Sequence, residues 1–257
     1  MNQADLGALI APVSAIARKA GDEILKIYGT DFAVRAKADA SPVTDADEAA
    51  ERIIIAELAR LTPDITIVSE EAAADKMPDA GSRYFWAVDP LDGTKEFVRR
   101  NDEFTVNIAL IIDRRPVLGV LHAPALGLTC SAAGAGTAMC QEGDAPPRPI
   151  AARRAPSDGV VVISSRSHKT DAELERFLAA RKVKARMVCG SALKFCRLAR
   201  GEADLYPRFG PCSEWDTAAG QAILEAAGGS VTTLDGGAFL YGKPGFLNFN
   251  FIARGKA

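Results

Sequence analysis

Acidic side chains gather in four short segments that either leave an apolar strand or begin a helix. Such positions direct side chains away from the ends of elements, where several segments can meet around one ligand. The four segments are Ser69-Glu70-Glu71, Asp89-Pro90-Leu91-Asp92-Gly93-Thr94, Trp215-Asp216 and Thr44-Asp45-Ala46-Asp47. Carboxylates that converge in this way are typical of sites for hard divalent cations such as Mg²⁺.

The segment DPLDGT is the most informative of the four. Pro90 restrains Asp89 to an extended conformation, and Gly93 allows the chain to turn sharply. The carboxylates of Asp89 and Asp92 and the carbonyl of Leu91 are then able to converge on one point. This mixture of oxygen ligands is the one that Mg²⁺ prefers.

Thr94 follows at the expected start of a helical turn. Its hydroxyl is placed to orient a water molecule, and the backbone N–H groups beside it are placed to bind an anion. A divalent cation next to an anion site predicts metal-assisted hydrolysis of a phosphate ester.

Taken singly, each acidic segment also has a simpler interpretation. Glu70 and Glu71 are compatible with a solvated strand edge, and Asp92-Gly93 is a common turn dipeptide. Asp216 and Asp47 are compatible with helix caps. A plain turn has no need of acids at both ends, however, so the pair Asp89 and Asp92 favours a metal site.

The elements that must position these residues follow from apolar periodicity and capping signals. A helix is expected from about residue 6 to Gly29, then a loop over 30–43, then a helix that begins at Thr44 and ends near Leu61, with Asp47 as capping-box partner. The expected strands of the first half are 64–69, 84–89, a hairpin of 104–112 and 116–122, and two short strands up to Cys140. The second half is expected to alternate: strand 160–164, helix 171–181, strand 183–188, helix 191–200, strand 203–206, helix 217–227 and strands near Val231 and Phe249.

A proline-rich segment, 141–158, separates these halves and is the best candidate for a boundary. The expected parts are an N-terminal α+β part, residues 1–155, with most metal ligands, and a C-terminal α/β part, residues 156–257, with the last metal ligand. Alternation of strands and helices in the second part is typical of an α/β layer. The catalytic site is expected between the two parts.

Composition excludes several classes of protein. A net charge of −2 argues against a nucleic-acid-binding protein. No apolar segment approaches the ~20 residues of a transmembrane helix, and the N-terminus does not resemble a signal peptide. The five cysteines form no CxxC pair and favour buried thiols in a reducing cytoplasm. With only His122 and His168 available, a zinc site is not expected.

The order SEE, DPLDGT and WD, with eleven residues between Asp216 and Gly228-Gly229, resembles the lithium-sensitive, magnesium-dependent phosphatases of the inositol monophosphatase superfamily. The resemblance covers nearly the whole chain. It implies a layered α/β/α/β/α sandwich of the sugar-phosphatase type, in the α+β and α/β classes. Other segments are similar to the 3'(2'),5'-bisphosphate nucleotidase branch: Ser41-Pro42-Val43-Thr44, Ser165-Arg166-Ser167-His168, 190–196 and 203–211. Asp45 and Cys212 depart from the usual residues of that branch, but neither is an expected ligand.

The resemblance also implies roles for individual residues. Two or three Mg²⁺ ions would be bound by Glu70, Asp89, Asp92, Asp216 and the carbonyl of Leu91, and Asp47 and Thr94 would act on the nucleophilic water. The residues implied to contact the substrate are Glu70, Leu91, Asp92, Gly93, Thr94, Ser165, His168, Gly190, Lys194, Arg208 and Asp216. Simpler alternatives remain for three of these: a solvated helix lysine for Lys194, a surface arginine for Arg208, and a helix cap or surface histidine for His168.

The expected function is therefore magnesium-dependent hydrolysis of the 3'-phosphate of adenosine 3',5'-bisphosphate to AMP and phosphate, in sulfate assimilation. An inositol-1-phosphate phosphatase of the same superfamily is the alternative, and Lys194 and Arg208 favour the bisphosphate. A third possibility, an inactive metal- or nucleotide-sensing module, has no need of Thr94. The oligomeric state and the preference between this nucleotide and its sulfated relative stay open. Some bacterial members associate with the cytoplasmic side of the inner membrane, but this composition does not require it.

Overall fold

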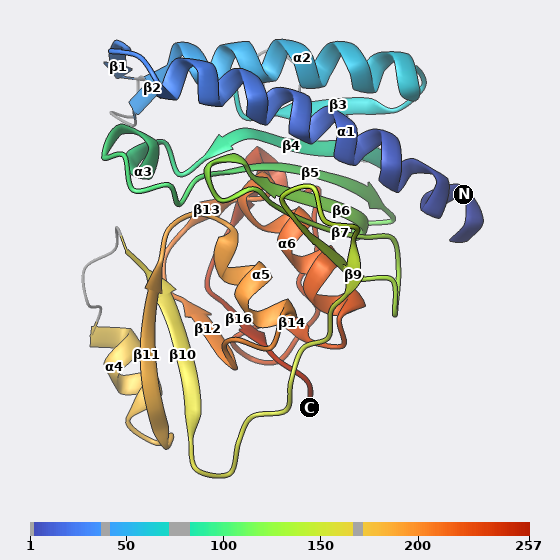
Figure 1. Ribbon diagram of the computed structural model, residues 1–257. Helices are drawn as coiled ribbons and strands as arrows, with labels where there is room; N and C mark the ends of the chain where they lie inside the picture. Colours follow the sequence, from blue (N-terminus) through green and yellow to red (C-terminus); the bar gives the residue numbers. More distant parts are fainter. Residues whose placement is uncertain (1–2, 37–41, 72–82, 167–171) are drawn as a thin grey trace.

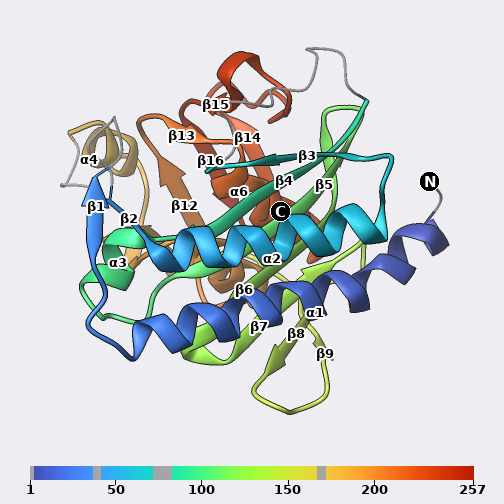
Figure 2. The same ribbon diagram turned by 90° about the horizontal axis from the view of Figure 1, so that it is seen from above.

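Two long helices cover one face of the larger of two main sheets. The structure, a computed structural model, describes residues 3–36, 42–71, 83–166 and 172–257. The helices α1 (Gln3–Tyr28) and α2 (Asp45–Leu61) lie side by side across that sheet (Figure 1, Figure 2). Their apolar stripes, which include Val13 and Ile54, are buried against it. The expected helices and the capping box of Thr44 and Asp47 are confirmed.

The larger sheet has seven strands in sequence order, from β3 to β9. β3 runs parallel to β4, and every later pair is antiparallel. Its strands are β3 (Thr66–Ser69), β4 (Tyr84–Asp92), β5 (Thr105–Ile112), β6 (Arg115–Ala123), β7 (Leu128–Ala132), β8 (Met139–Glu142) and β9 (Arg148–Pro149). Because helices cover both faces, β5 is buried along nearly its whole length.

The second main sheet has five strands in the order β11-β10-β12-β16-β14. β10 is parallel to β11 and to β12, and β16 is antiparallel to β12 and to β14. Its strands are β10 (Val160–Ser165), β11 (Val183–Cys189), β12 (Leu205–Arg208), β14 (Ser230–Thr233) and β16 (Phe251–Arg254). α4 (Ala172–Leu178) packs on its outer face through Leu178.

Two helices fill the space between the sheets (Figure 1). These are α5 (Leu193–Ala199) and α6 (Trp215–Ala226), whose buried side chains join the main core cluster. α6 crosses β6 so closely that a Cβ at Gly119 would lie 2.5 Å from the carbonyl oxygen of Ala219. The layers therefore run α/β/α/β/α, and the predicted fold class is confirmed.

The short elements differ most from the sequence-based expectation. The loop predicted over 30–43 contains β1 (Val34–Ala36), which pairs antiparallel with β2 (Pro42–Thr44). Strands of three residues are too short to show alternation. β9 likewise lies inside the proline-rich segment 141–158, at the edge of the larger sheet. The remaining short elements are α3 (Thr94–Val98), β13 (Cys212–Ser213), β15 (Leu247–Asn248), η1 (Pro124–Leu126) and η2 (Pro244–Phe246).

Division of the chain into residues 1–155 and 156–257 remains a prediction. The two main sheets do lie on opposite sides of residue 155. α6, however, contacts both β6 of the larger sheet and β14 of the smaller one.

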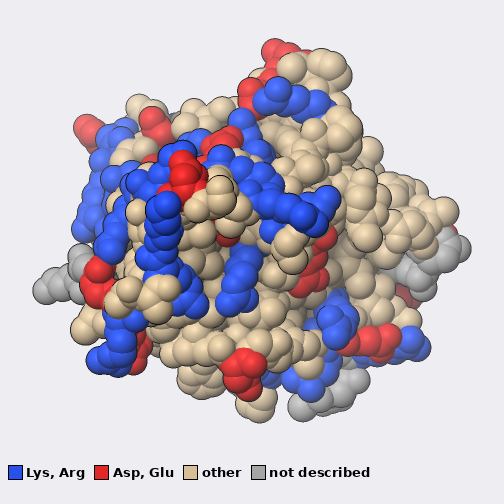
Figure 3. Space-filling model, turned by 90° about the horizontal axis from the view of Figure 1, so that it is seen from below, with Lys and Arg blue, Asp and Glu red and all other residues tan. Residues whose placement is uncertain are grey.

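All five cysteines are buried, as predicted, and each is a free thiol. Within the described residues, no helix combines the length and apolarity needed to span a membrane. Many Lys and Arg side chains lie on the face opposite α1 and α2, with acids among them (Figure 3). Among the described residues, Arg153 pairs with Asp204, and Arg186 pairs with Glu175.

Candidate metal and phosphate site

A cavity of about 270 Å³ lies between the two main sheets, and residues of α5 and α6 form part of its wall. Strand ends and helix starts converge on it from both halves of the chain. Ten of the predicted site residues line it: Glu70, Asp89, Leu91, Asp92, Gly93, Thr94, Ser165, Lys194, Arg208 and Asp216. The structure therefore brings most of the predicted site residues together around one cavity.

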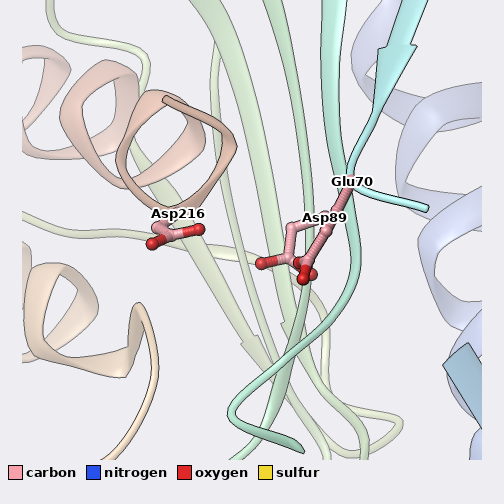
Figure 4. Close-up of side chains that lie close together, drawn as sticks. All are labelled: Glu70, Asp89 and Asp216. Atoms are coloured by element: carbon pink, nitrogen blue, oxygen red, sulfur yellow. The ribbon is translucent and has the colours of Figure 1, made fainter. Parts of the chain in front are cut away.

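Three carboxylates face one another in this cavity (Figure 4). Oxygen atoms of Glu70, Asp89 and Asp216 all lie within 4.8 Å of one another. Glu70 follows β3, and its N–H donates to the carbonyl of Val88 at 3.1 Å, so the parallel pairing of β3 with β4 places Glu70 beside Asp89. Asp216 approaches from the first turn of α6.

The turn after Asp89 is sharp, as Pro90 and Gly93 predict, but Asp92 is not one of the three carboxylates that lie within 4.8 Å of one another. The Leu91 N–H donates to Oδ1 of Asp89 at 3.0 Å, and the pairing of β4 with β5 is interrupted between Asp89 and Asp92. Gly93 has a φ of 92° and leads into α3. A Cβ at Gly93 would lie 3.1 Å from the carbonyl oxygen of Glu103, so both conformation and space favour glycine.

Asp92 is held by two donors from other parts of the chain. Its Oδ2 accepts from the Ala192 N–H at 2.5 Å and from Nδ2 of Asn107 at 3.3 Å. Burial raises the pKa of Asp92 to about 6, although the positive charge of Lys194 and these hydrogen bonds lower it. Asn107 was missed by sequence reasoning, and its signal was a polar residue inside the apolar run of β5.

Burial also raises the pKa values of Asp89 and Asp216 well above their ordinary range. The neighbouring carboxylate of Glu70 adds to the shift in both cases, since like charges disfavour ionisation. A divalent cation would reverse this by supplying positive charge to an all-oxygen donor set. The residues present therefore fit a divalent metal ion, and the all-oxygen donor set favours a hard cation over softer metals.

Asp47 serves two neighbours at once. Its Oδ2 accepts from the N–H and the hydroxyl of Thr44, both at 2.7 Å, which completes the capping box of α2. Its Oδ1 lies 3.3 Å from Oγ1 of Thr94. Capping and a role in the site are therefore compatible, because each uses a different carboxylate oxygen.

Two cations contribute to the cavity wall. The side chain of Lys194 is buried, and its Nζ donates to the carbonyl oxygens of Cys189 and Ser191. The solvated-lysine alternative is therefore wrong, because α5 faces the core at this position. Arg208 donates from Nη2 to the carbonyl of Pro211 at 2.9 Å, while its Nε is buried without a hydrogen-bond partner among the described residues.

The remaining predicted contacts have different outcomes. Ser165 lines the cavity from the end of β10. Gly190 is not among the lining residues; its N–H donates to Oε2 of Glu103 at 2.8 Å. His168 lies outside the described residues. Lys95 also lines the cavity and was not predicted, since nothing in its local sequence distinguishes it from a solvated lysine.

Comparison with known proteins gives one consistent family. The profile of the inositol monophosphatase family matches residues 5–254. The 3'(2'),5'-bisphosphate nucleotidase CysQ of Escherichia coli (strain K12) is 45% identical over 247 residues, which are 95% of this chain and 98% of that protein. The protein of the same name from Salmonella typhimurium is 46% identical over 248 residues, with the same coverage.

Solved structures agree with this result. CysQ from Bacteroides thetaiotaomicron, a bacterial member of the inositol monophosphatase family, matches with a TM-score of 0.80 and 36% identity over 95% of this chain and 96% of that one. The inositol monophosphatase of Anabaena matches with a TM-score of 0.77 and 26% identity over 97% and 91% of the two chains.

Replacing Asp216 by Asn removes one negative charge from the cavity with little change of shape. Without metal, we expect Asp216→Asn to melt no lower than the unaltered protein, because burial already disfavours the ionised form. Mg²⁺ at a hundredfold excess over its Kd adds about 2.7 kcal/mol of stability, a rise of roughly 5–10 °C in Tm for a chain of this size. The variant should show much less of this rise.

The pH dependence has a definite sign. The raised pKa values mean that the folded, metal-free protein binds more protons than the unfolded chain, so stability falls as pH rises from about 4 past about 6. Asp216→Asn should flatten this fall, whereas the exposed Asp64→Asn should not. A marked loss of Tm in metal-free Asp216→Asn would instead show that the Asp216 carboxylate stabilises the fold, through the hydrogen bond that it accepts from the Ser213 N–H.

Proposed function

The chain belongs to the inositol monophosphatase family, and we propose that it is a magnesium-dependent phosphatase that hydrolyses the 3'-phosphate of adenosine 3',5'-bisphosphate to AMP and phosphate, in sulfate assimilation. The observation that carries this proposal is a single cavity that combines the carboxylates of Glu70, Asp89 and Asp216 with the cations Lys194 and Arg208. Relatives 45% identical over nearly the full length bear the name of a 3'(2'),5'-bisphosphate nucleotidase.

The metal ligands in this proposal are the carboxylates of the cavity together with one carbonyl. Glu70, Asp89, Asp92, Asp216 and the Leu91 carbonyl would hold two or three Mg²⁺ ions. When bound, Mg²⁺ polarises the phosphate and lowers the pKa of water. The three carboxylates that lie within 4.8 Å of one another support this assignment.

Thr94 and Asp47 orient the attacking water in the proposed reaction. The Thr94 hydroxyl lies 3.3 Å from Oδ1 of Asp47 and 3.3 Å from the carbonyl oxygen of Leu91. In the proposed reaction it donates its proton to Asp47, so its oxygen is left to accept a hydrogen bond from water. Asp47 cannot easily turn away, because its other oxygen is held by Thr44. A lone pair of the water is thereby directed toward phosphorus, and as the new P–O bond forms, the bond between phosphorus and the 3'-oxygen breaks. The proton that the water loses passes to the Thr94 oxygen while the Thr94 proton passes to Asp47. The leaving 3'-oxygen takes up a proton from solvent and becomes the 3'-hydroxyl of AMP.

The substrate spans the cavity between two groups of contacts. Gly93 and Thr94 bind the phosphate that is hydrolysed, at the start of α3. Arg208 binds the second phosphate through the positive charge that its guanidinium brings to the cavity wall. Ser165 contacts the nucleoside from the end of β10. Lys194 adds positive charge but has its own partners, so its effect is shared by all substrates.

An inositol-1-phosphate phosphatase is not favoured, because that substrate has no second phosphate for Arg208. The test is phosphate release from adenosine 3',5'-bisphosphate and from inositol-1-phosphate, each with Mg²⁺ and with a chelator. We expect release only with Mg²⁺ and a kcat/KM at least about tenfold higher for the bisphosphate, the effect of one charged hydrogen bond. Equal efficiencies would favour the inositol-phosphate activity, and binding without any release would favour a sensing module.

Substitution of Arg208 tests the second-phosphate contact. Arg208→Gln should lower kcat/KM for adenosine 3',5'-bisphosphate by about ten- to a hundredfold, since a charge-assisted hydrogen bond contributes roughly 1.5–3 kcal/mol. Adenosine 3'-monophosphate has the same scissile bond without the 5'-phosphate, so its hydrolysis should barely change. Arg186→Gln, at an exposed arginine on β11, is the matched control. An equal loss on both nucleotides would show that Arg208 supports the fold of the site instead.

A further inference from the structure

One acidic residue outside the metal cluster connects the two halves of the site. Glu103 lies in the loop between α3 and β5, and its Oε2 accepts from the Gly190 N–H at 2.8 Å, across 87 residues of sequence. Two residues beyond Gly190, the Ala192 N–H donates to Oδ2 of Asp92 at 2.5 Å. Glu103 thus holds one end of a short turn whose other end holds an expected metal ligand.

The turn that Glu103 holds, residues 189–192, is backbone that needs support. Ser191 has a φ of 45°, in the left-handed region that non-glycine residues rarely adopt and that costs roughly 1–3 kcal/mol. At Gly190 a Cβ would lie 2.5 Å from Cγ of Glu96 and 2.8 Å from the carbonyl oxygen of Glu103. The carbonyls on either side of Gly190 accept from Lys194. Glu103 therefore holds the turn at the Gly190 N–H, and Lys194 holds it at the two carbonyl groups on either side.

Arg166 completes the support. Its Nε and Nη2 donate to the two oxygens of Glu103 at 2.8 and 2.9 Å, and its backbone N–H donates to the carbonyl of Cys189 at 3.3 Å. Burial alone would raise the pKa of Glu103, yet the hydrogen bonds from Arg166 and Gly190 hold it below its ordinary value. Arg166 also directly follows Ser165, which lines the cavity.

We propose that Glu103, held by Arg166, is a positioning residue that fixes the 189–192 turn and through it the orientation of Asp92 and Lys194. The inference rests on the proposed function for its kinetic readout and on metal binding for a readout independent of it. Neither Glu103 nor Arg166 is among the described residues that line the cavity. Both therefore act through the turn rather than on the substrate.

The obvious alternative is an ordinary ion pair at the surface, which contributes little. The chain offers a matched control for it. Arg83 and Asp113 form another two-bond pair, at 2.7 and 3.0 Å, and both side chains are more than half exposed. Arg83 directly precedes β4, so this pair lies at the end of the strand opposite to Asp89 and Asp92.

The experiment compares Glu103→Ala, Glu103→Gln and Arg166→Ala with Asp113→Ala. Two quantities are measured: kcat and KM for adenosine 3',5'-bisphosphate, and the Mg²⁺ concentration that gives half of the metal-dependent rise in Tm. For Glu103→Ala we expect kcat to fall about tenfold or more, KM to change little, and the half-saturating Mg²⁺ concentration to rise about tenfold. Arg166→Ala should change both quantities in the same direction, by less.

Glu103→Gln should recover much of the loss, because its amide oxygen still accepts from the Gly190 N–H while the charge for Arg166 is gone. Asp113→Ala should leave kcat and the Mg²⁺ dependence unchanged. The proposal is overturned if Glu103→Ala keeps both quantities at the values of the unaltered protein, or if it loses only metal-free Tm, as a structural ion pair would. If the unaltered protein released no phosphate, the proposed function would fail, while the Mg²⁺ dependence of Tm would still test Glu103.

Discussion

Repulsion among buried carboxylates is the constraint around which this fold is arranged. Glu70, Asp89 and Asp216 hold oxygen atoms within 4.8 Å of one another, and Asp92 lines the same cavity. Bringing several negative charges out of water at one place opposes folding. A chain of marginal stability tolerates such a group where rigid elements impose it and where a cation can bind. The layered sandwich supplies those elements from both halves of the sequence, so the site and the packing of the sheets depend on each other.

Backbone donors and two cations relieve part of this repulsion before any metal binds. Asp89, Asp92 and Asp216 each accept from a backbone N–H. Lys194 lowers the pKa of Asp92, and Arg208 lowers that of Asp216, although burial outweighs both. These donors also fix the direction of each carboxylate, which is what a metal site needs for a defined coordination geometry. The supports are therefore as much part of the site as the ligands themselves.

Local signals in the sequence were sufficient to single out the proposed metal ligands but not the residues that support them. DPLDGT carries its own geometry, since Pro90 and Gly93 fix the turn that brings Asp89 near Asp92. The capping box of α2 is equally local. Glu103 and Arg166, by contrast, are 63 residues apart, and only the packing of the two halves brings them together. The same holds for the buried environment of Lys194, which helical periodicity alone assigned to either solvent or core.

Diffraction from crystals soaked in Mn²⁺ tests the central claim most directly, because Mn²⁺ takes oxygen ligands like those of Mg²⁺ and gives an anomalous signal. The account predicts anomalous peaks between the carboxylates of Glu70, Asp89 and Asp216, at the ~2.0–2.2 Å ligand distances typical of small divalent ions. Peaks absent from this cavity at saturating Mn²⁺, or found only at other acidic groups on the surface, would contradict it.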